Sequence, residues 1–140
     1  METALYNGQS VLVDKIVYKL FSPSKDDVIV FLPNGNEKSH YYIKRVVAVP
    51  GETVQIKDGV LYVNGEAVLD DEHDYDKMED AGIAENEIKL GNGESFVLGD
   101  NRNSSEDSRS ANIGVVKLST IAGKAWFCYG SESGKNGFVK

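Results

Sequence analysis

The chain has 140 residues, of which 41% are hydrophobic and 26% are charged, and its formal net charge is −7. This length fits a single domain, and the apolar content is sufficient for a core, which excludes global disorder. The negative charge argues against a nucleic-acid-binding protein, which would carry a basic stripe. No run approaches the roughly 20 apolar residues of a membrane span, and no signal peptide is visible, so we expect these residues to be soluble.

Short runs rich in β-branched residues and bounded by turn formers predict a mainly β fold. The first two runs are residues 10–13 and 28–31. The second is apolar on both faces, which is typical of a buried central strand. Residues 41–49 form the longest predicted strand, and Pro50 and Gly51 end it.

A hairpin is predicted directly after this strand. Residues 54–56 and 60–63 flank Asp58-Gly59, a dipeptide typical of a two-residue hairpin turn, and Asn64-Gly65 provides a second turn. Residues 69–92 are polar, acidic and weakly periodic, which predicts a loop or short helix that could lie over the sheet as a flap.

The remaining segments add three strands and little helix. The predicted strands are residues 95–98, 114–118 and 122–129. The closing residues 130–140 are rich in Gly, Ser and Lys, and we expect them to be frayed. The sequence contains no internal repeat.

The remaining candidate ligands have structural interpretations. Cys128 is the only cysteine, which excludes an internal disulfide, and its place in a predicted strand indicates a packed thiol. His40 and His73 lack metal-ligand spacing, and we expect both at the surface. The acidic residues within 70–80 are typical of a solvated loop.

Lys44 is the first residue whose position indicates chemistry. Side-chain alternation places it on one face with Tyr42, Val46 and Ala48, and this face is apolar or aromatic. Burial disfavours the ammonium form, so such a lysine can lose its proton near neutral pH and act as a general base. From the pattern alone, the alternative is a lysine that extends into solvent from a strand end.

A polar loop at residues 99–109 follows a predicted strand and carries hydroxyl, carboxylate and guanidinium groups. Such a loop can build a hydrogen-bond network behind a site, although composition by itself favours a polar surface turn. Within it, we expect Asp100 and Arg102 to be structural.

Taken together and in this order, the segments resemble the conserved blocks of the type I signal peptidase family. Residues 26–31, 42–52 and 99–109 are similar to three of these blocks. Residues 113–114 and 121–125 are similar to the closing strands of the family. The resemblance covers roughly residues 1–130, apart from the acidic stretch.

The resemblance implies a signal peptidase/LexA-like β fold of antiparallel sheets with a small β-rich cap insertion. The catalytic core would comprise residues 1–50 and 95–140, and the cap would comprise residues 51–94, including the acidic loop.

The family is a group of serine endopeptidases with a Ser-Lys dyad, in which a neutral lysine removes the proton of a nucleophilic serine. The resemblance implies that Lys44 is this base and that Ser105 orients its amine. Asp107 and Arg109 match a salt bridge that braces the site, and Arg45 is a further candidate for this supporting network. No metal or cofactor is implied.

A substrate groove lined by Met1, Leu5, Tyr42 and Ile43 is also implied. The substrate, the signal-peptide region of a preprotein, would pair as an extended strand beside residues 41–45. Shallow apolar pockets would restrict cleavage to Ala-x-Ala-like sites, because larger side chains would clash.

The opening of the chain departs from the first block of the family, Ser-Met-x-Pro-Thr-Leu. Met1 aligns with the methionine after the serine, so the nucleophile and its oxyanion-hole donors would precede Met1. We therefore expect these 140 residues to be inactive by themselves. The parent protein would be anchored in the bacterial cytoplasmic membrane, with its catalytic domain on the extracytoplasmic face.

Two alternatives remain. A non-catalytic homologue that acts in pilus or secretion assembly, with pilin subunits as partners, is favoured by the missing serine and by Thr3-Ala4, and is opposed by Lys44 and Ser105. A self-cleaving repressor of the LexA type would also use a Ser-Lys site, but neither a DNA-binding domain nor a cleavable segment is seen.

Overall fold

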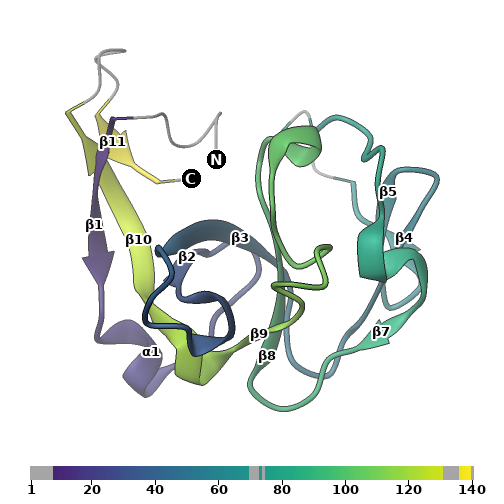
Figure 1. Ribbon diagram of the computed structural model, residues 1–140, viewed down its shortest axis with the longest axis horizontal. Coiled ribbons are helices and arrows are strands. Elements are labelled where there is room, and N and C mark those ends of the chain that lie inside the picture. Colours follow the sequence, from purple (N-terminus) through teal and green to yellow (C-terminus); the bar gives the residue numbers. More distant parts are fainter. Residues whose placement is uncertain (1–7, 70–72, 74, 131–135, 140) are drawn as a thin grey trace.

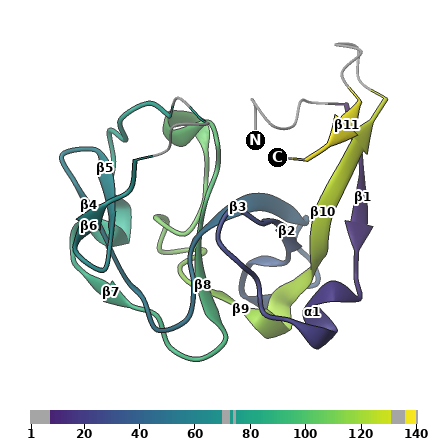
Figure 2. The same cartoon turned by 180° about the vertical axis from the view of Figure 1, so that it is seen from behind.

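The computed structural model describes residues 8–69, 73, 75–130 and 136–139, and it confirms the predicted mainly β fold of antiparallel sheets. Met1 and Leu5, two of the predicted groove residues, lie outside this described part. The two sheets lie side by side in Figure 1, and Figure 2 shows the same arrangement from behind.

Within the described residues, the larger sheet has seven strands. Its order is β1 (Ser10–Asp14), β10 (Ile121–Tyr129), β2 (Val28–Phe31), β3 (Tyr42–Ala48), β8 (Glu94–Leu98) and β9 (Val116–Lys117), and β11 (Gly137–Phe138) also pairs with β10. All four residues of β2 are buried, as predicted for a central strand. The predicted strand over residues 114–118 is shorter than expected, and the predicted frayed C-terminus was wrong for residues 137–138.

In the described part of the chain, the smaller sheet has four strands in the order β6 (Glu66–Ala67), β5 (Val60–Val63), β4 (Thr53–Lys57) and β7 (Ile88–Lys89). Both predicted turns are confirmed. Asp58 and Gly59 have φ values of 50° and 77°, and Asn64 and Gly65 have values of 52° and 79°. Two consecutive left-handed residues are what a type I′ hairpin turn requires.

Short helices connect the strands. They are the α-helix α1 (Val17–Leu20) and the 3₁₀ helices η1 (Pro33–Gly35), η2 (Gly82–Glu85), η3 (Arg102–Ser104) and η4 (Leu118–Thr120). In the part of the chain that the structure describes, no helix has the length and apolar character required to cross a membrane.

A shared core joins the two sheets. Val54 and Leu61 of the smaller sheet pack in one cluster with Phe96 and Leu98 of β8. The polar segment before β8 also contributes to this cluster, through the buried side chains of Met78, Ala84 and Leu90. The division into a catalytic core and a cap at residues 51–94 stays a prediction.

Strand β3 carries an irregularity that the alternation pattern did not predict. Its register against β8 shifts between Val46 and Ala48. Val46 packs with Ile29 and Phe31, whereas Ala48 packs in the cluster shared with the smaller sheet. Placing Ala48 on the face of Lys44 was therefore wrong, because a bulge reverses the alternation of the side chains beyond it.

The cysteine and histidines partly match their predicted places. Cys128 is buried, with its thiol 3.5 Å from the carbonyl oxygen of Gly137. His40 is exposed, as expected. His73 is half-buried and stacks on Tyr75, with ring centroids 5.2 Å apart, so it is only partly exposed at the surface.

Candidate active site

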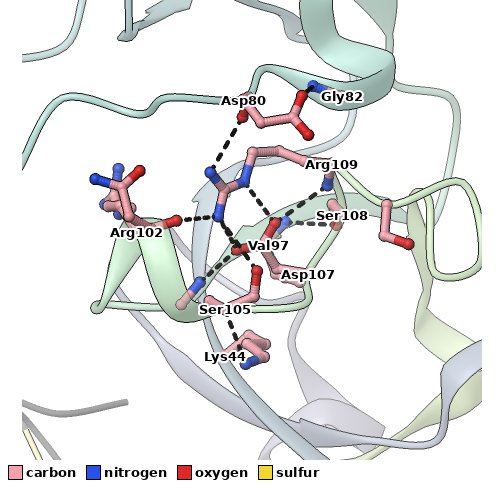
Figure 3. Close-up of polar contacts among 12 residues, drawn as sticks. Lys44, Asp80, Gly82, Val97, Arg102, Ser105, Asp107, Ser108 and Arg109 are labelled. Atoms are coloured by element: carbon pink, nitrogen blue, oxygen red, sulfur yellow. Dashed lines mark hydrogen bonds and ion pairs between the residues drawn. The ribbon is translucent and has the colours of Figure 1, made fainter.

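Lys44 and Ser105 meet at the centre of the site, although they are 61 residues apart in the sequence. The Lys44 Nζ donates a hydrogen bond to the Ser105 Oγ at 3.0 Å (Figure 3). The pairing of β3 with β8 brings them together, because Ser105 lies in the loop that follows β8. The resemblance predicted this contact.

The face of β3 that carries Lys44 is apolar. Ile29 of β2 lies directly opposite Lys44 in the sheet and is fully buried. Burial lowers the pKa of the Lys44 amine below its usual value. The negative charges of Asp107 and Glu106 oppose this effect, and the positive charge of Arg109 adds to it. The neutral amine that a general base requires is therefore more accessible at Lys44 than at an exposed lysine.

Gly99 provides the space that Ser105 occupies. A Cβ atom at this position would overlap the Ser105 hydroxyl and would lie 3.5 Å from the Lys44 Nζ. The Gly99 N–H donates to the Asp107 Oδ2 at 3.0 Å, which ties the start of the loop to its end. A residue with a side chain here would push the hydroxyl away from the amine.

Asp107 and Arg109 form the supporting ion pair that the resemblance implied. The Arg109 Nε and Nη2 donate to the two Asp107 carboxylate oxygens at 2.9 Å each, and both side chains are buried. Such a two-point pair fixes orientation as well as distance.

The rest of the Arg109 guanidinium holds the loop in place. Its Nη2 also donates to the backbone carbonyl oxygens of Arg102 at 2.5 Å and Ser105 at 3.5 Å, and its Nη1 donates to that of Asp80 at 3.3 Å (Figure 3). Arg109 therefore positions the residue whose hydroxyl receives the Lys44 hydrogen bond.

Ser108 attaches the same loop to the sheet. Its N–H donates to the Val97 carbonyl oxygen at 3.1 Å, and its Oγ accepts from the Val97 N–H at 3.0 Å. Ser108 is fully buried. The loop thus returns along β8, which explains why Ser105 is held beside β3.

Among the described contacts, Arg45 pairs with Asp100 rather than with the Asp107–Arg109 pair, and its place in the supporting network stays a prediction. It lies on the opposite face of β3, where its Nε and Nη2 donate to the Asp100 carboxylate at 2.9 and 3.0 Å. Both side chains are buried, and Tyr75 also donates to Asp100, at 3.3 Å. The physical reason is strand alternation, because consecutive residues point to opposite faces.

Tyr42 and Ile43, the two described groove candidates, are half-buried on opposite faces of β3. Tyr42 packs with the cluster of Phe31 and Val46, and Ile43 packs with that of Val28 and Val30. They therefore do not line one pocket on one face. An extended chain at the edge of β3 would contact both, because its own side chains also alternate.

The N-terminal half of β3 has an open edge. β2 pairs with residues Tyr42 to Arg45, but the described pairs with β8 begin only at Arg45. Among the described strands, Tyr42 to Lys44 are therefore paired on one side only. A strand edge beside the Lys44 amine that no described strand occupies is a template for an added strand.

Two hollows share Glu106, the residue directly after Ser105, in their lining. One of about 370 Å³ includes Ser105, Asp107 and Arg109 in its lining, and one of about 240 Å³ includes Tyr42 and Ile113. A further hollow of about 450 Å³ is lined by residues of the opposite face, and its described lining contains neither Lys44 nor Ser105.

Sequence reasoning missed Glu106 as part of the site. Its carboxylate accepts a hydrogen bond from the Tyr42 hydroxyl at 3.2 Å, and it lines both hollows. The charge of Glu106, followed by burial and the hydrogen bond, raises the pKa of Tyr42. The sequence signal that could have identified Glu106 is its position directly after Ser105, within the block that resembles the family.

Comparisons with known proteins agree with this architecture. The family model described as "Signal peptidase, peptidase S26" matches residues 1–130. The chain is 31% identical to signal peptidase I of Bacillus licheniformis, over 92% of this chain and 71% of that relative. It is 36% identical to signal peptidase I of Bacillus caldolyticus, over 92% of this chain and 74% of that relative.

A solved structure gives the same result. The crystal structure of a signal peptidase I from Enterococcus faecalis matches with a TM-score of 0.55 and 30% sequence identity, covering 74% of this chain and 97% of that chain. Fold and sequence together define a β-rich protein of the peptidase class. The chain belongs to the signal peptidase family, peptidase S26, and its similarity is to bacterial signal peptidase I.

Proposed function

We propose that the chain is the catalytic region of a serine endopeptidase that removes signal peptides from secreted preproteins after Ala-x-Ala-like sites. The observation that carries this proposal is the 3.0 Å contact between the Lys44 amine and the Ser105 hydroxyl beside the open edge of β3.

The nucleophile in this proposal is a serine that the encoded protein carries directly before Met1. The neutral Lys44 amine takes the proton from its hydroxyl, and the oxygen attacks the scissile carbonyl carbon. The tetrahedral intermediate collapses to an ester between the serine and the signal peptide. The departing amine of the mature protein takes the proton from Lys44 as the peptide bond breaks.

Deacylation repeats the proton transfers with water. Lys44 accepts a proton from water, and the resulting hydroxide equivalent attacks the ester carbonyl. The serine oxygen leaves and recovers its proton from Lys44, which regenerates the neutral amine. Ser105 contributes by fixing the direction of the amine, as the orienting member of a triad does.

The preprotein binds as an extended strand along the edge from Tyr42 to Lys44. Backbone hydrogen bonds give affinity, and alternating side chains contact Tyr42 on one face and Ile43 on the other. The family resemblance also assigns Met1 and Leu5, which lie outside the described residues, to this groove. The parent protein is anchored in the bacterial cytoplasmic membrane and acts on its extracytoplasmic side. No cofactor takes part in this mechanism.

A pair of protein forms tests the proposal. A form with a serine directly before Met1 and the encoded residues upstream of it should cleave an Ala-x-Ala peptide, and the 140 residues alone should not. Lys44→Ala in the longer form should lower kcat/KM by about 10²–10⁴-fold, because the general base is lost. Mass spectrometry of the products gives the cleavage site.

A lysine away from the site provides the control. Lys57→Ala removes an exposed lysine of the smaller sheet and should leave the rate unchanged. A Lys44→Ala form that cleaves at the parental rate would contradict the mechanism. An encoded residue other than serine before Met1, together with pilin binding, would favour the non-catalytic assembly homologue.

A further inference from the structure

We propose that Glu106 is a specificity-determining residue whose carboxylate selects substrates with a basic side chain two residues from the scissile bond. This inference rests on the proposed function and deepens it, because it assigns a charge preference to the same site.

The position of Glu106 is the first reason. It directly follows Ser105, and its side chain is exposed at the surface rather than buried in the loop network. The Tyr42 hydroxyl donates to its carboxylate at 3.2 Å. Tyr42 is two residues before Lys44 on β3, so the two side chains lie on the same face. The carboxylate therefore stands beside the Lys44–Ser105 contact.

The hollow on the Tyr42 side has the size of a side-chain subsite. Its volume of about 240 Å³ is below the roughly 300–1,000 Å³ of pockets that hold whole small molecules. Tyr42 and Ile113 give it an apolar wall, and Glu106 is the one acidic or basic residue in its described lining. The rest of that lining is Pro33, Asn34, Asn36, Ser39 and Asn112.

The hollow on the other side of Glu106 has the same sign of charge. Its lining includes the exposed carboxylates of Glu79 and Asp80 together with Glu106. The Asp107–Arg109 pair in it is internally neutralised, which leaves the Arg102 guanidinium against three carboxylates. Both hollows therefore favour a positively charged side chain.

The Glu106 carboxylate has capacity for a substrate. Within the described part of the chain, the Tyr42 hydroxyl is its only hydrogen-bond partner. An ionised carboxylate offers about four acceptor positions, so a lysine or arginine can bind without breaking this contact. The tyrosine holds the carboxylate in place and is not a competing cation.

Strand geometry sets the position in the substrate. Residues that point to one face of a strand are two apart, and each residue advances the chain by about 3.3 Å. A strand on the edge of β3 that places the residue with the scissile carbonyl beside Lys44 has two residues that can lie next to Tyr42: the third residue before the bond or the second residue after it. The third residue before the bond is the first alanine of the Ala-x-Ala site, so the basic side chain belongs to the second residue after the bond. The side chain of that residue enters the hollow that Glu106 lines.

Peptide kinetics on the serine-bearing form test this inference. Lysine, glutamine and glutamate are placed in turn at the second residue on each side of the bond in an Ala-x-Ala peptide. At the second residue after the bond, we expect kcat/KM for lysine to exceed that for glutamine by about two- to fivefold, as for an exposed ion pair. At the second residue before the bond, which points to the other face, the ratio should be close to one. The glutamate peptide should be the poorest substrate, and added salt should reduce the differences.

Variants assign the preference to one carboxylate. Glu106→Gln should bring the lysine-to-glutamine ratio close to one, and Glu106→Lys should favour the glutamate peptide. Glu66→Gln, which removes an exposed carboxylate from the smaller sheet, should keep the original ratio. A change in the protonation of Lys44 alters kcat/KM for the lysine and glutamine peptides equally. The ratio of the two values within each variant therefore reports only the charge preference.

Three results would overturn the inference, and they can be told apart. Equal kcat/KM for lysine and glutamine peptides in the parental form contradicts only the charge preference. A preference that persists in Glu106→Gln contradicts the assignment to this residue. The absence of cleavage of every peptide contradicts the proposed function on which the inference rests.

Discussion

Lys44 and Arg45 are neighbours in the chain, but β3 directs them to opposite faces of the sheet and to different partners. Lys44 meets the hydroxyl of Ser105, and burial lowers its pKa. Burial alone would also lower the pKa of Arg45, but the hydrogen bonds and charge of Asp100 raise it overall. The comparison shows that the partner, as well as burial, sets the direction in which the pKa of a shielded cation moves.

The largest effect on stability should come from breaking the buried ion pair between Arg45 and Asp100. Arg45→Met leaves the buried Asp100 carboxylate without its ion-pair partner, and we expect the free energy of unfolding to fall by about 3–5 kcal/mol. Urea denaturation followed by circular dichroism measures this loss. Arg45→Met combined with Asp100→Leu should recover much of it, because no buried charge is then left unpaired. A double variant as unstable as the single one would contradict this account.

A smaller effect should follow from giving Lys44 a charged partner. Ser105→Asp places a carboxylate where the hydroxyl is, which makes the Lys44 face resemble the Arg45 face. An opposite charge at this distance favours the ammonium form. We expect the serine-bearing form to lose at least about tenfold in kcat/KM at pH 7 and to recover partly as the pH rises. Ser105→Ala is the matched control, because it should lose rate without this recovery.

The pH dependence of stability should show the smallest effect. The pKa of Lys44 is lowered in the folded protein from its usual value of 10.5, so the folded chain binds fewer protons than the unfolded chain between those two values. Stability should therefore rise with pH through this window, relative to Lys44→Met. Urea midpoints across pH 7 to 10.5 measure it. Parallel curves for the two proteins would show that Lys44 does not titrate differently on folding.

The local sequence was sufficient where the physical cause is local. Asp58-Gly59 and Asn64-Gly65 specify their turns because these residues tolerate left-handed backbone. The apolar run of β2 predicted a buried strand because both faces of a central strand lie in the core. Lys44 was conspicuous because a cation on an apolar face has a desolvation cost that a sequence pattern makes visible.

Tertiary structure decided which groups meet. Ser105 reaches Lys44 across 61 residues only because β3 pairs with β8 and Arg109 holds the intervening loop. The resemblance supplied this contact, whereas strand periodicity alone did not. The face of Ala48 depended on a bulge, and bulges have no reliable signature in a single strand.

The sequence by itself thus determined the strand pattern, the two hairpin turns and the candidacy of Lys44 as a general base, because each depends on residues close in the chain. Only the folded chain decided that Arg45 pairs with Asp100 rather than with Asp107, and that Glu106 stands beside Tyr42. Ion-pair and hydrogen-bond partners are chosen by proximity in space, and proximity is set by the path of the loop after β8.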